Sequence, residues 1–275
     1  SLNPKQKDAV LFCDGHELVL AGAGSGKTKV LTTKIAYLIR EKGIPPRRIL
    51  ALTFTNKAAK EMKNRVELLL DSNLGGMEVS TFHAYGLRFL HRYSEGLEAL
   101  GYPRSFVIFD RSDTKGIVKK LLTRLDIDTK TMDISGAIEL ISRAKTESNP
   151  VTREPNIEYK WRKLYDEYQK SLLECGALDF DDLMILPLHI IAKNKDVRER
   201  ERARLDWILV DEYQDVNKPQ YLLLRCLVDS GRNIMVVGDP DQSIYGWRGA
   251  DMSMIMNFEN DFKNAHVVVL DQNYR

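Results

Sequence analysis

The chain has 275 residues, of which 43% are apolar and 29% are charged. These values are ordinary for a soluble globular protein of about two domains, and they exclude a disordered, collagen-like or coiled-coil chain. The 41 Lys and Arg residues nearly balance the 39 Asp and Glu residues, which leaves a net charge of +2. Any surface for nucleic acid must therefore come from local clustering of basic residues.

The cysteines and the apolar stretches indicate the cellular compartment. The three cysteines lie far apart, at Cys13, Cys175 and Cys226. This spacing predicts neither a disulfide framework nor a structural zinc site, as in a reducing compartment. The longest apolar stretch, residues 183–192, is much shorter than the ~20 residues that span a membrane, and no signal peptide is recognisable. We therefore expect a soluble cytoplasmic protein.

Short apolar runs alternate with helical stretches over most of the length. The expected strands are residues 18–21, 49–54, 78–81, 207–210, 234–237 and 267–270. Most are nearly continuous Val, Ile and Leu runs, which is typical of strands that are covered on both faces. This alternation predicts an α/β fold with a mainly parallel sheet.

The pattern changes between about residues 101 and 177. Strand signals are weak there, and amphipathic segments at residues 113–125, 134–145 and 158–173 predict helices. Turn residues such as Gly101, Pro103 and Gly176 mark the edges. We therefore expect an α/β domain in two parts, residues 1–88 and 178–275, interrupted by a helical insertion at residues 89–177.

A phosphate-binding loop follows the first expected strand. Its residues are Ala21, Gly22, Ala23, Gly24, Ser25, Gly26, Lys27 and Thr28, and a helix is expected at residues 29–40. Small residues let backbone N–H groups surround phosphate oxygens, the lysine reaches the β- and γ-phosphates, and the threonine hydroxyl binds Mg²⁺. The spacing and the lysine exclude a Rossmann dinucleotide motif.

Acidic residues follow the expected strand at residues 207–210. Asp211 at the end of a buried strand beside a phosphate loop is suited to holding Mg²⁺ through water, and Glu212 to acting as the base for an attacking water. A solvated acidic turn is the alternative, which the pairing with Lys27 and Thr28 disfavours.

Polar and aromatic residues alternate after the expected strand at residues 234–237. Gln242 is placed to sense the γ-phosphate, because ligands bind at the carboxyl ends of parallel strands. Tyr245, Trp247 and Arg248 suit stacking on unpaired bases and contact with a DNA backbone. A packing role for Trp247 is an equal alternative.

Two more strand ends carry candidate DNA contacts. Thr53, Phe54 and Asn56 follow the second expected strand, and His83 follows the third. They offer hydroxyl, amide and aromatic groups for a sugar-phosphate backbone and a stacked base. Helix capping, with Thr55 as the N-cap of a helix at residues 57–70, and a buried histidine are the alternatives. The basic clusters of the insertion are interspersed with acidic residues, which favours a solvated helix face.

Taken in order, these segments resemble the UvrD/Rep (PcrA-like) DNA helicases of superfamily 1A. Residues 2–6 resemble the Q motif, the phosphate loop motif I, residues 53–59 motif Ia, and residues 81–83 the next DNA-contact motif. Residues 178–183 resemble motif Id, residues 211–215 motif II, residues 237–250 motif III, and residues 272–275 the start of motif IV. The resemblance therefore extends over the whole chain.

The resemblance implies further roles. At the adenine, Gln6 would pair with the base and Tyr274 would stack on it. Gln242 and Arg275 would approach the γ-phosphate, and Gln214 would couple nucleotide state to DNA. Lys29 would stand where relatives often carry Arg. For DNA, Phe54, Phe180, Tyr245 and Trp247 would line pockets for single-strand bases.

The resemblance also implies an architecture and an activity. A RecA-like ATPase domain, 1A, would be interrupted by helical domain 1B, and domains 2A and 2B, which carry motifs V and VI and complete the ATP site, would lie outside these residues. The implied function is the N-terminal half of an ATP- and Mg²⁺-dependent 3′→5′ DNA helicase that acts on single strands and junctions in repair, replication or recombination. The motor portion of a helicase-nuclease and an ATP-gated binding module are the alternatives.

Overall fold

The computed structural model describes residues 2–72, 74–228, 232–239, 255 and 257–272. The chain forms two compact units, each described by itself below. The sheet unit comprises Ser1–Phe82 and Glu199–Arg275, and the helical unit comprises His83–Arg198. The helical unit is longer at both ends than the insertion expected at residues 89–177. Helix α9 (Asp182–Lys193) explains much of the difference, because it is apolar on nearly all sides and packs against helices of the helical unit.

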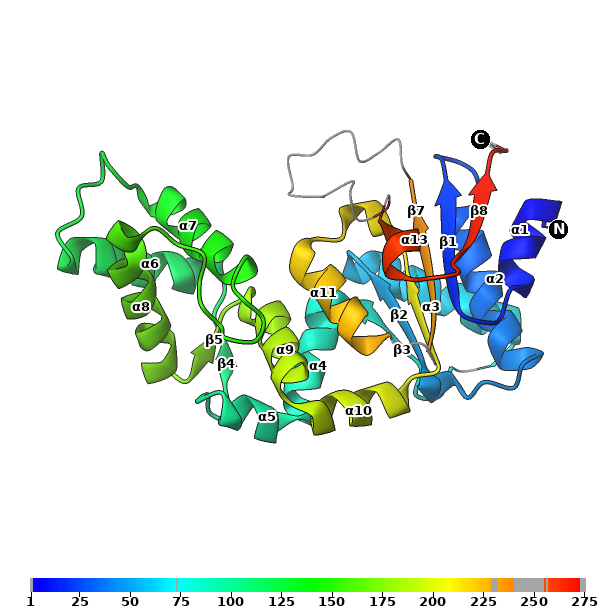
Figure 1. Cartoon of the computed structure of the whole chain (residues 1–275), viewed down its shortest axis with the longest axis horizontal. Coiled ribbons are helices and arrows are strands. Elements are labelled where there is room, and N and C mark those ends of the chain that lie inside the picture. The colour runs from blue at the N-terminus through cyan, green and yellow to red at the C-terminus, as the bar shows by residue number, and fades with distance from the viewer. Residues whose placement is uncertain (1, 73, 229–231, 240–254, 256, 273–275) are drawn as a thin grey trace. The chain divides into compact units, whose positions relative to one another are not determined.

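The sheet unit is built on a parallel sheet whose strands confirm the sequence prediction. The strands are β1 (His16–Ala21), β2 (Ile49–Thr53), β3 (Glu78–Thr81), β6 (Trp207–Val210), β7 (Asn233–Gly238) and β8 (His266–Leu270). Their order is β3-β2-β6-β7-β1-β8, and every neighbouring pair is parallel (Figure 1). The fold is therefore of the RecA-like α/β class, and all carboxyl ends of the strands meet at one edge.

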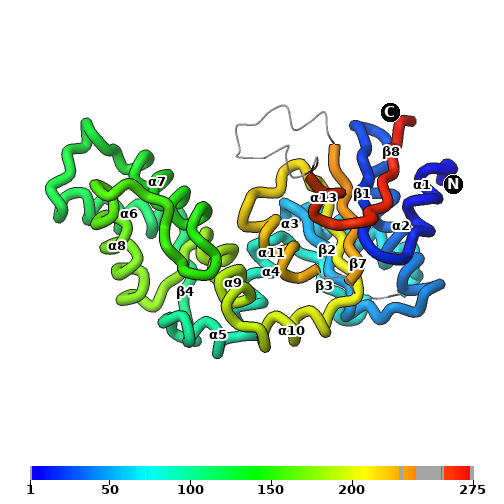
Figure 2. Tube along the Cα trace, in the orientation of Figure 1, coloured from blue at the N-terminus to red at the C-terminus, as the bar shows by residue number. Residues whose placement is uncertain are grey.

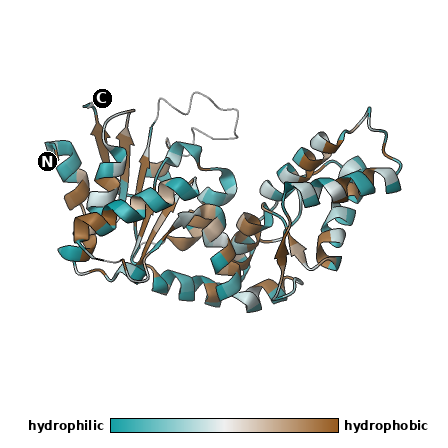
Figure 3. Ribbon diagram, turned by 180° about the vertical axis from the view of Figure 1, so that it is seen from behind, coloured by the Kyte–Doolittle hydropathy of each residue, from teal (hydrophilic) through white to brown (hydrophobic). Residues whose placement is uncertain are grey.

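Helices cover both faces of this sheet. The described helices of the sheet unit are α1 (Pro4–Leu11), α2 (Lys27–Arg40), α3 (Asn56–Leu70), α11 (Lys218–Leu227) and α13 (Phe258–Asp261), with 3₁₀ turns at Pro46–Arg48 and Tyr213–Asp215. Helix α10 (Lys195–Arg204) is shared between the two units. Alternate strand residues such as Val19, Ala51 and Leu209 form one core with α1, α2 and α3. Helix α11 lies on the opposite face, and apolar strands fill the interior (Figures 1 and 3).

Local signals in the sequence set where several helices begin. Thr55 caps α3 by accepting a hydrogen bond from the Ala58 N–H, which confirms its predicted capping role. Asn3 and Asn217 begin α1 and α11 with reciprocal capping boxes. Helix α1 and strand β8 lie side by side although they come from opposite ends of the sequence (Figure 2), and Lys5 pairs with Asp271 at 2.6 Å.

The helical unit packs amphipathic helices around its own core. It contains most of α4 (Phe82–Arg92), followed by α5 (Ser94–Ala99), α6 (Arg111–Arg124), α7 (Ile134–Thr146), α8 (Tyr159–Glu174) and α9. The three helices predicted in the insertion are α6, α7 and α8, and their apolar faces meet in one cluster. A small parallel pair, β4 (Val107–Ile108) and β5 (Ala177–Leu178), was not predicted, because two-residue strands are too short to show a periodic pattern. In the part of the chain that the structure describes, no helix is long and apolar enough to cross a membrane.

Candidate functional site

The register of the sheet brings the predicted nucleotide residues to one edge. Leu20 at the end of β1 lies opposite Gly238 at the end of β7, and Val210 at the end of β6 lies opposite Val236. The phosphate loop, Asp211 and Asp239 therefore leave three neighbouring strands at the same edge. This is where ligands bind in parallel α/β sheets.

The phosphate loop has a conformation that its glycines permit. Gly24 and Gly26 have φ angles of +79° and +88°, which residues with a Cβ rarely adopt. The Ser25 hydroxyl and N–H both donate to the Gly22 carbonyl, at 2.7 and 3.2 Å, and close the turn. Helix α2 then begins at Lys27, so its N-terminal dipole faces the loop. This arrangement can bind an anion.

The Lys27 ammonium lies between two carboxylates. Its Nζ is 3.3 Å from Glu212 Oε2 and 3.5 Å from Asp239 Oδ2. Glu212 is 39% exposed, whereas Asp239 is almost fully buried. The two contacts are long for charge-assisted hydrogen bonds, which are about 2.7–2.9 Å. An ammonium held this loosely can turn toward phosphate oxygens.

Asp211 is the residue best suited to a divalent cation. Burial, together with the charge of the adjacent Glu212, raises the pKa of Asp211 to about 6. A bound cation would supply the missing positive charge at this carboxylate, and the Thr28 hydroxyl at the start of α2 is the second predicted ligand. Within the described ranges no three His, Cys, Asp or Glu side chains cluster as metal ligands. A site with only one or two protein ligands is nevertheless suited to Mg²⁺, because this ion commonly takes its other ligands from phosphates and water.

Glu212 is held in an unusual backbone conformation. Its φ of 49° and ψ of 47° are left-handed, which costs a residue with a side chain about 1–3 kcal/mol. The Glu212 N–H donates to Asp211 Oδ1 at 2.9 Å. Gln214 then donates to Glu212 Oε2 at 2.7 Å, and its own Oε1 accepts the Asp239 N–H at 2.9 Å. Gln214 therefore connects the ends of β6 and β7.

Gln6 lies under the phosphate loop. Its Nε2 donates to the Ser25 carbonyl at 2.9 Å, and its Oε1 accepts the Asn3 N–H at 3.1 Å. The side chain is almost fully buried, and it is so close to Gly26 that a Cβ there would lie 2.8 Å from Gln6 Nε2. In this arrangement Gln6 braces the loop, and its predicted contact with adenine stays a prediction.

The predicted DNA residues of the sheet unit differ in exposure. Asn56 is exposed at the start of α3, and Phe54 is half-buried with its ring 5.5 Å from that of Phe82. Thr53 is fully buried, and its hydroxyl donates to the Thr55 carbonyl at 3.1 Å. Phe54 and Asn56 therefore offer surface to a ligand, whereas the Thr53 side chain does not.

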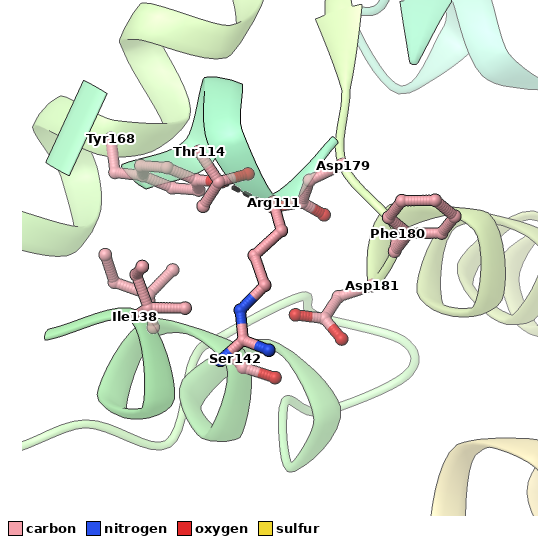
Figure 4. A pocket seen from close by; sticks show the side chains of 9 residues that line it. Arg111, Thr114, Ile138, Ser142, Tyr168, Asp179, Phe180 and Asp181 are labelled. Atoms are coloured by element: carbon pink, nitrogen blue, oxygen red, sulfur yellow. Dashed lines mark hydrogen bonds between the residues drawn. The ribbon is translucent and has the colours of Figure 1, made fainter. Parts of the chain in front are cut away.

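The predicted DNA residues of the helical unit form an aromatic pair. Phe180 is 52% exposed, and its ring lies edge-on to that of His83 with 6.2 Å between the centroids. His83 is exposed, so the alternative of a core histidine is wrong. Phe180 also lines a pocket of about 260 Å³ with Arg111, Ser142 and Asp181 (Figure 4). Its lining combines apolar side chains such as Ile138 with the charged side chains of Arg111 and Asp181.

A buried ion cluster holds the segment that carries Phe180. Lys145 Nζ is 2.7 Å from Asp179 Oδ2 and 2.8 Å from Asp182 Oδ1, and Tyr168 donates to Asp179 at 2.8 Å. The backbone N–H groups of Asp179 and Asp182 donate to each other's carboxylates. Although burial disfavours its charge, the two carboxylates raise the pKa of Lys145 well above its usual value. The cluster fixes the turn at residues 179–182.

Six predicted site residues lie outside the described residues. They are Gln242, Tyr245, Trp247, Arg248, Tyr274 and Arg275. Conversely, Asp239 and Lys145 were not among the site residues predicted from the sequence. Asp239 directly follows a buried strand, as Asp211 does, so its place in the sequence could have predicted it as a site residue. Nothing in the basic clusters of the insertion distinguished Lys145 from its exposed neighbours.

The parallel sheet with its phosphate loop and acidic strand ends defines a RecA-like nucleotide-binding domain. Residues 2–263 match the family model described as the UvrD/REP helicase N-terminal domain. The chain belongs to this family.

Curated relatives agree with this assignment. Over its full length the chain is 44% identical to the ATP-dependent DNA helicase PcrA of Bacillus subtilis, of which it covers 37%. It is 42% identical to the ATP-dependent DNA helicase PcrA of Staphylococcus aureus, with 38% covered, and 41% identical to that of Leuconostoc citreum, with 37% covered. The chain therefore spans somewhat more than a third of the length of these relatives.

Proposed function

We propose that the chain is the ATP- and single-strand-binding half of an ATP-dependent 3′→5′ DNA helicase. The observation that carries this proposal is the position of Lys27, which stands at the end of a glycine-rich loop between Glu212 and Asp239. The helicase relatives and the family support the same activity. The chemistry is phosphoryl transfer from ATP to water.

The phosphate chain lies along the loop and the N-terminus of α2. Lys27 leaves its two carboxylates and neutralises phosphate charge, since short charge-assisted hydrogen bonds to phosphate oxygens are stronger than two long ion pairs. Thr28 and Asp211 would hold Mg²⁺, which would supply further charge neutralisation. The released Glu212 carboxylate then accepts a proton from the attacking water, and Gln214 keeps that carboxylate in place.

The DNA contacts lie on both units. Phe54 and Asn56 in the sheet unit, and His83 and Phe180 in the helical unit, offer aromatic and polar surface. Stacking on such rings tolerates any base and contributes about 1–3 kcal/mol per base. By the family resemblance, Tyr245, Trp247 and Arg248 would add further contacts with the DNA. Binding is therefore independent of sequence and weakens as salt concentration rises.

The first test measures binding and hydrolysis of Mg-ATP by these 275 residues, with and without an oligo-dT strand. Lys27→Ala should weaken binding by about 10- to 100-fold, because a charge-assisted contact contributes about 1.5–3 kcal/mol. Lys60→Ala, which changes an exposed lysine of α3, is the control and should bind as the wild type does. Equal binding by Lys27→Ala and wild type would contradict the proposed site.

The same measurement addresses the alternatives. By the family resemblance, an arginine of motif VI would lie outside these residues, and such an arginine raises turnover by about 10³–10⁵ in phosphate-loop enzymes. We therefore expect binding with little turnover. In the full-length protein, stimulation of ATP hydrolysis by single-stranded DNA supports a motor, whereas stimulation by a protein partner alone supports an ATP-gated binding module.

A further inference from the structure

A fully buried ion pair joins β1 to α2, the helix that follows the phosphate loop. Lys34 of α2 and Glu17 of β1 have no exposed side-chain surface, and Lys34 Nζ is 3.2 Å from Glu17 Oε2. The ammonium also lies 4.9 Å from the centroid of the Trp207 ring. Burying such a pair is expensive, and apolar side chains of the same volume would often stabilise a fold as well. Its presence therefore calls for a role beyond packing.

Lys34 donates to the carbonyls at the end of α1. Its Nζ is 3.0 Å from the Ala9 oxygen and also bonds to the Phe12 oxygen. The last carbonyls of a helix have no partners within the helix and carry the negative end of its dipole, so a buried ammonium is a strong partner for them. Glu17 balances the charge. Lys34 thus fastens the C-terminal end of α1 to α2.

The N-terminal part of α1 is fastened to the phosphate loop. Gln6 donates to the Ser25 carbonyl and packs against Gly26, the residue that precedes Lys27. Lys34 lies seven residues after Lys27 on the same helix, about 10 Å along its axis. Helix α1 is therefore attached to α2 at one end and to the loop at the other. A shift of α1 along α2 would move Gln6 out from under the loop.

We propose that Lys34 is a positioning residue for nucleotide binding, which acts through α1 and Gln6 to hold the phosphate loop in its binding conformation. This inference rests on the proposed function. Among the described residues, Lys34 bonds to Ala9, Phe12 and Glu17, none of which belongs to the predicted nucleotide site. Its effect on affinity must therefore disappear when Gln6 can no longer brace the loop.

The test is a double-mutant cycle on Mg-ATP affinity in the full chain. The paired variant Lys34→Met/Glu17→Met removes both charges and fills a similar volume, so no unpaired charge stays buried. The Ala9 and Phe12 carbonyls lose a donor, so its thermal stability should fall moderately, and its affinity is measured at a temperature where circular dichroism shows it fully folded. We expect its Kd for Mg-ATP to rise about 10-fold, and we expect no further rise when the pair is combined with Gln6→Ala, because coupled residues are not additive. Arg48→Met/Asp206→Met is the matched control. This pair joins the N-terminal ends of β2 and β6, whereas the nucleotide site lies at their carboxyl ends, so the Kd should not change.

Two results would overturn the inference. The first is a folded paired variant that binds Mg-ATP with wild-type affinity. The second is a paired variant that loses the same affinity in the wild-type and the Gln6→Ala backgrounds, as a general structural effect would produce. If the paired variant does not fold, Lys34→Gln/Glu17→Gln keeps two polar groups that can bond to each other and is judged by the same criteria. The proposed function fails separately, if the wild type and Lys27→Ala bind Mg-ATP equally.

Discussion

The two units each place a lysine between two carboxylates, yet the two arrangements differ in the length of their contacts and in their exposure to water. In the sheet unit, Lys27 faces Glu212 and Asp239 at 3.3 and 3.5 Å, and Glu212 is partly exposed. In the helical unit, Lys145 faces Asp179 and Asp182 at 2.7 and 2.8 Å. All three members of the second cluster are buried, and further hydrogen bonds satisfy their oxygens.

The difference separates a binding site from a structural support. Long contacts on an open edge lose little when a phosphate replaces them, so the Lys27 cluster is suited to exchange partners. Short contacts without access to water lose much when one partner is removed, so the Lys145 cluster holds its segment in one arrangement. The same residue types therefore serve a ligand in one unit and stability in the other.

The largest expected effect lies at the open cluster. Glu212→Gln in the full-length protein should lower ATP turnover by about 10²–10⁴-fold, because the amide cannot accept the proton of the attacking water. Binding of Mg-ATP should persist, since the amide keeps the shape of the side chain. Steady-state hydrolysis and equilibrium nucleotide binding measure the two effects. Unchanged turnover would remove Glu212 from the role of base.

The next effect lies at the closed cluster. Lys145→Met should lower the free energy of unfolding by about 3–5 kcal/mol, because it leaves two buried carboxylates without a counter-charge. Mg-ATP affinity should not change. Urea unfolding followed by circular dichroism provides the measurement, and Lys170→Met, which changes an exposed lysine of α8, is the control. A loss as small as that of the control would show that the two clusters do not differ as described.

A smaller effect is expected beside the closed cluster. Phe180→Ala should weaken binding of oligo-dT by about 1–3 kcal/mol through the loss of one stacking surface. Tyr159→Ala is the matched control, because Tyr159 is 95% exposed on α8 and has no proposed DNA role. Fluorescence anisotropy at constant salt measures both. Equal losses in the two variants would argue against a specific site at Phe180.

The smallest effect is a pH dependence beside the open cluster. Because the pKa of Asp211 is about 6, its carboxylate takes up a proton below that pH and loses its affinity for a cation. Mg-ATP affinity should therefore fall by up to about 10-fold per pH unit below about 6. Titration calorimetry at several pH values tests this, and Asp211→Asn should bind weakly at all of them.

Protonation of Asp211 also changes the free energy of unfolding. The pKa of Asp211 is raised above its ordinary value of 3.8, so the folded state favours the protonated form. Without Mg²⁺ the free energy of unfolding should fall as the pH rises from about 4 to about 6, and Asp211→Asn should be more stable than the wild type at neutral pH. A less stable Asp211→Asn variant at pH 7 would contradict the raised pKa.

Local sequence was sufficient for much of the fold. The six strands of the large sheet and the helices α2, α3, α6, α7 and α8 were predicted, because continuous apolar runs and amphipathic periods report burial directly. The cap at Thr55 was predicted from its residue type, and the glycines at positions 24 and 26 permit the positive φ angles that the structure shows there. The bounds of the helical unit were harder to predict from the sequence, because an apolar helix such as α9 can pack with the unit that precedes it or with the unit that follows it.

By itself, the sequence determined the class of the protein and the residues of the phosphate loop, since a strand, a glycine-rich turn, Lys27 and a helix are contiguous along the chain. Only the tertiary structure decided that Asp239 faces Lys27, that Gln6 braces Ser25, and that Lys34 and Lys145 are buried with their carboxylates. The physical reason is that these contacts join strand ends and helices far apart in sequence. The charge of a lysine does not reveal whether water or a buried carboxylate will surround it.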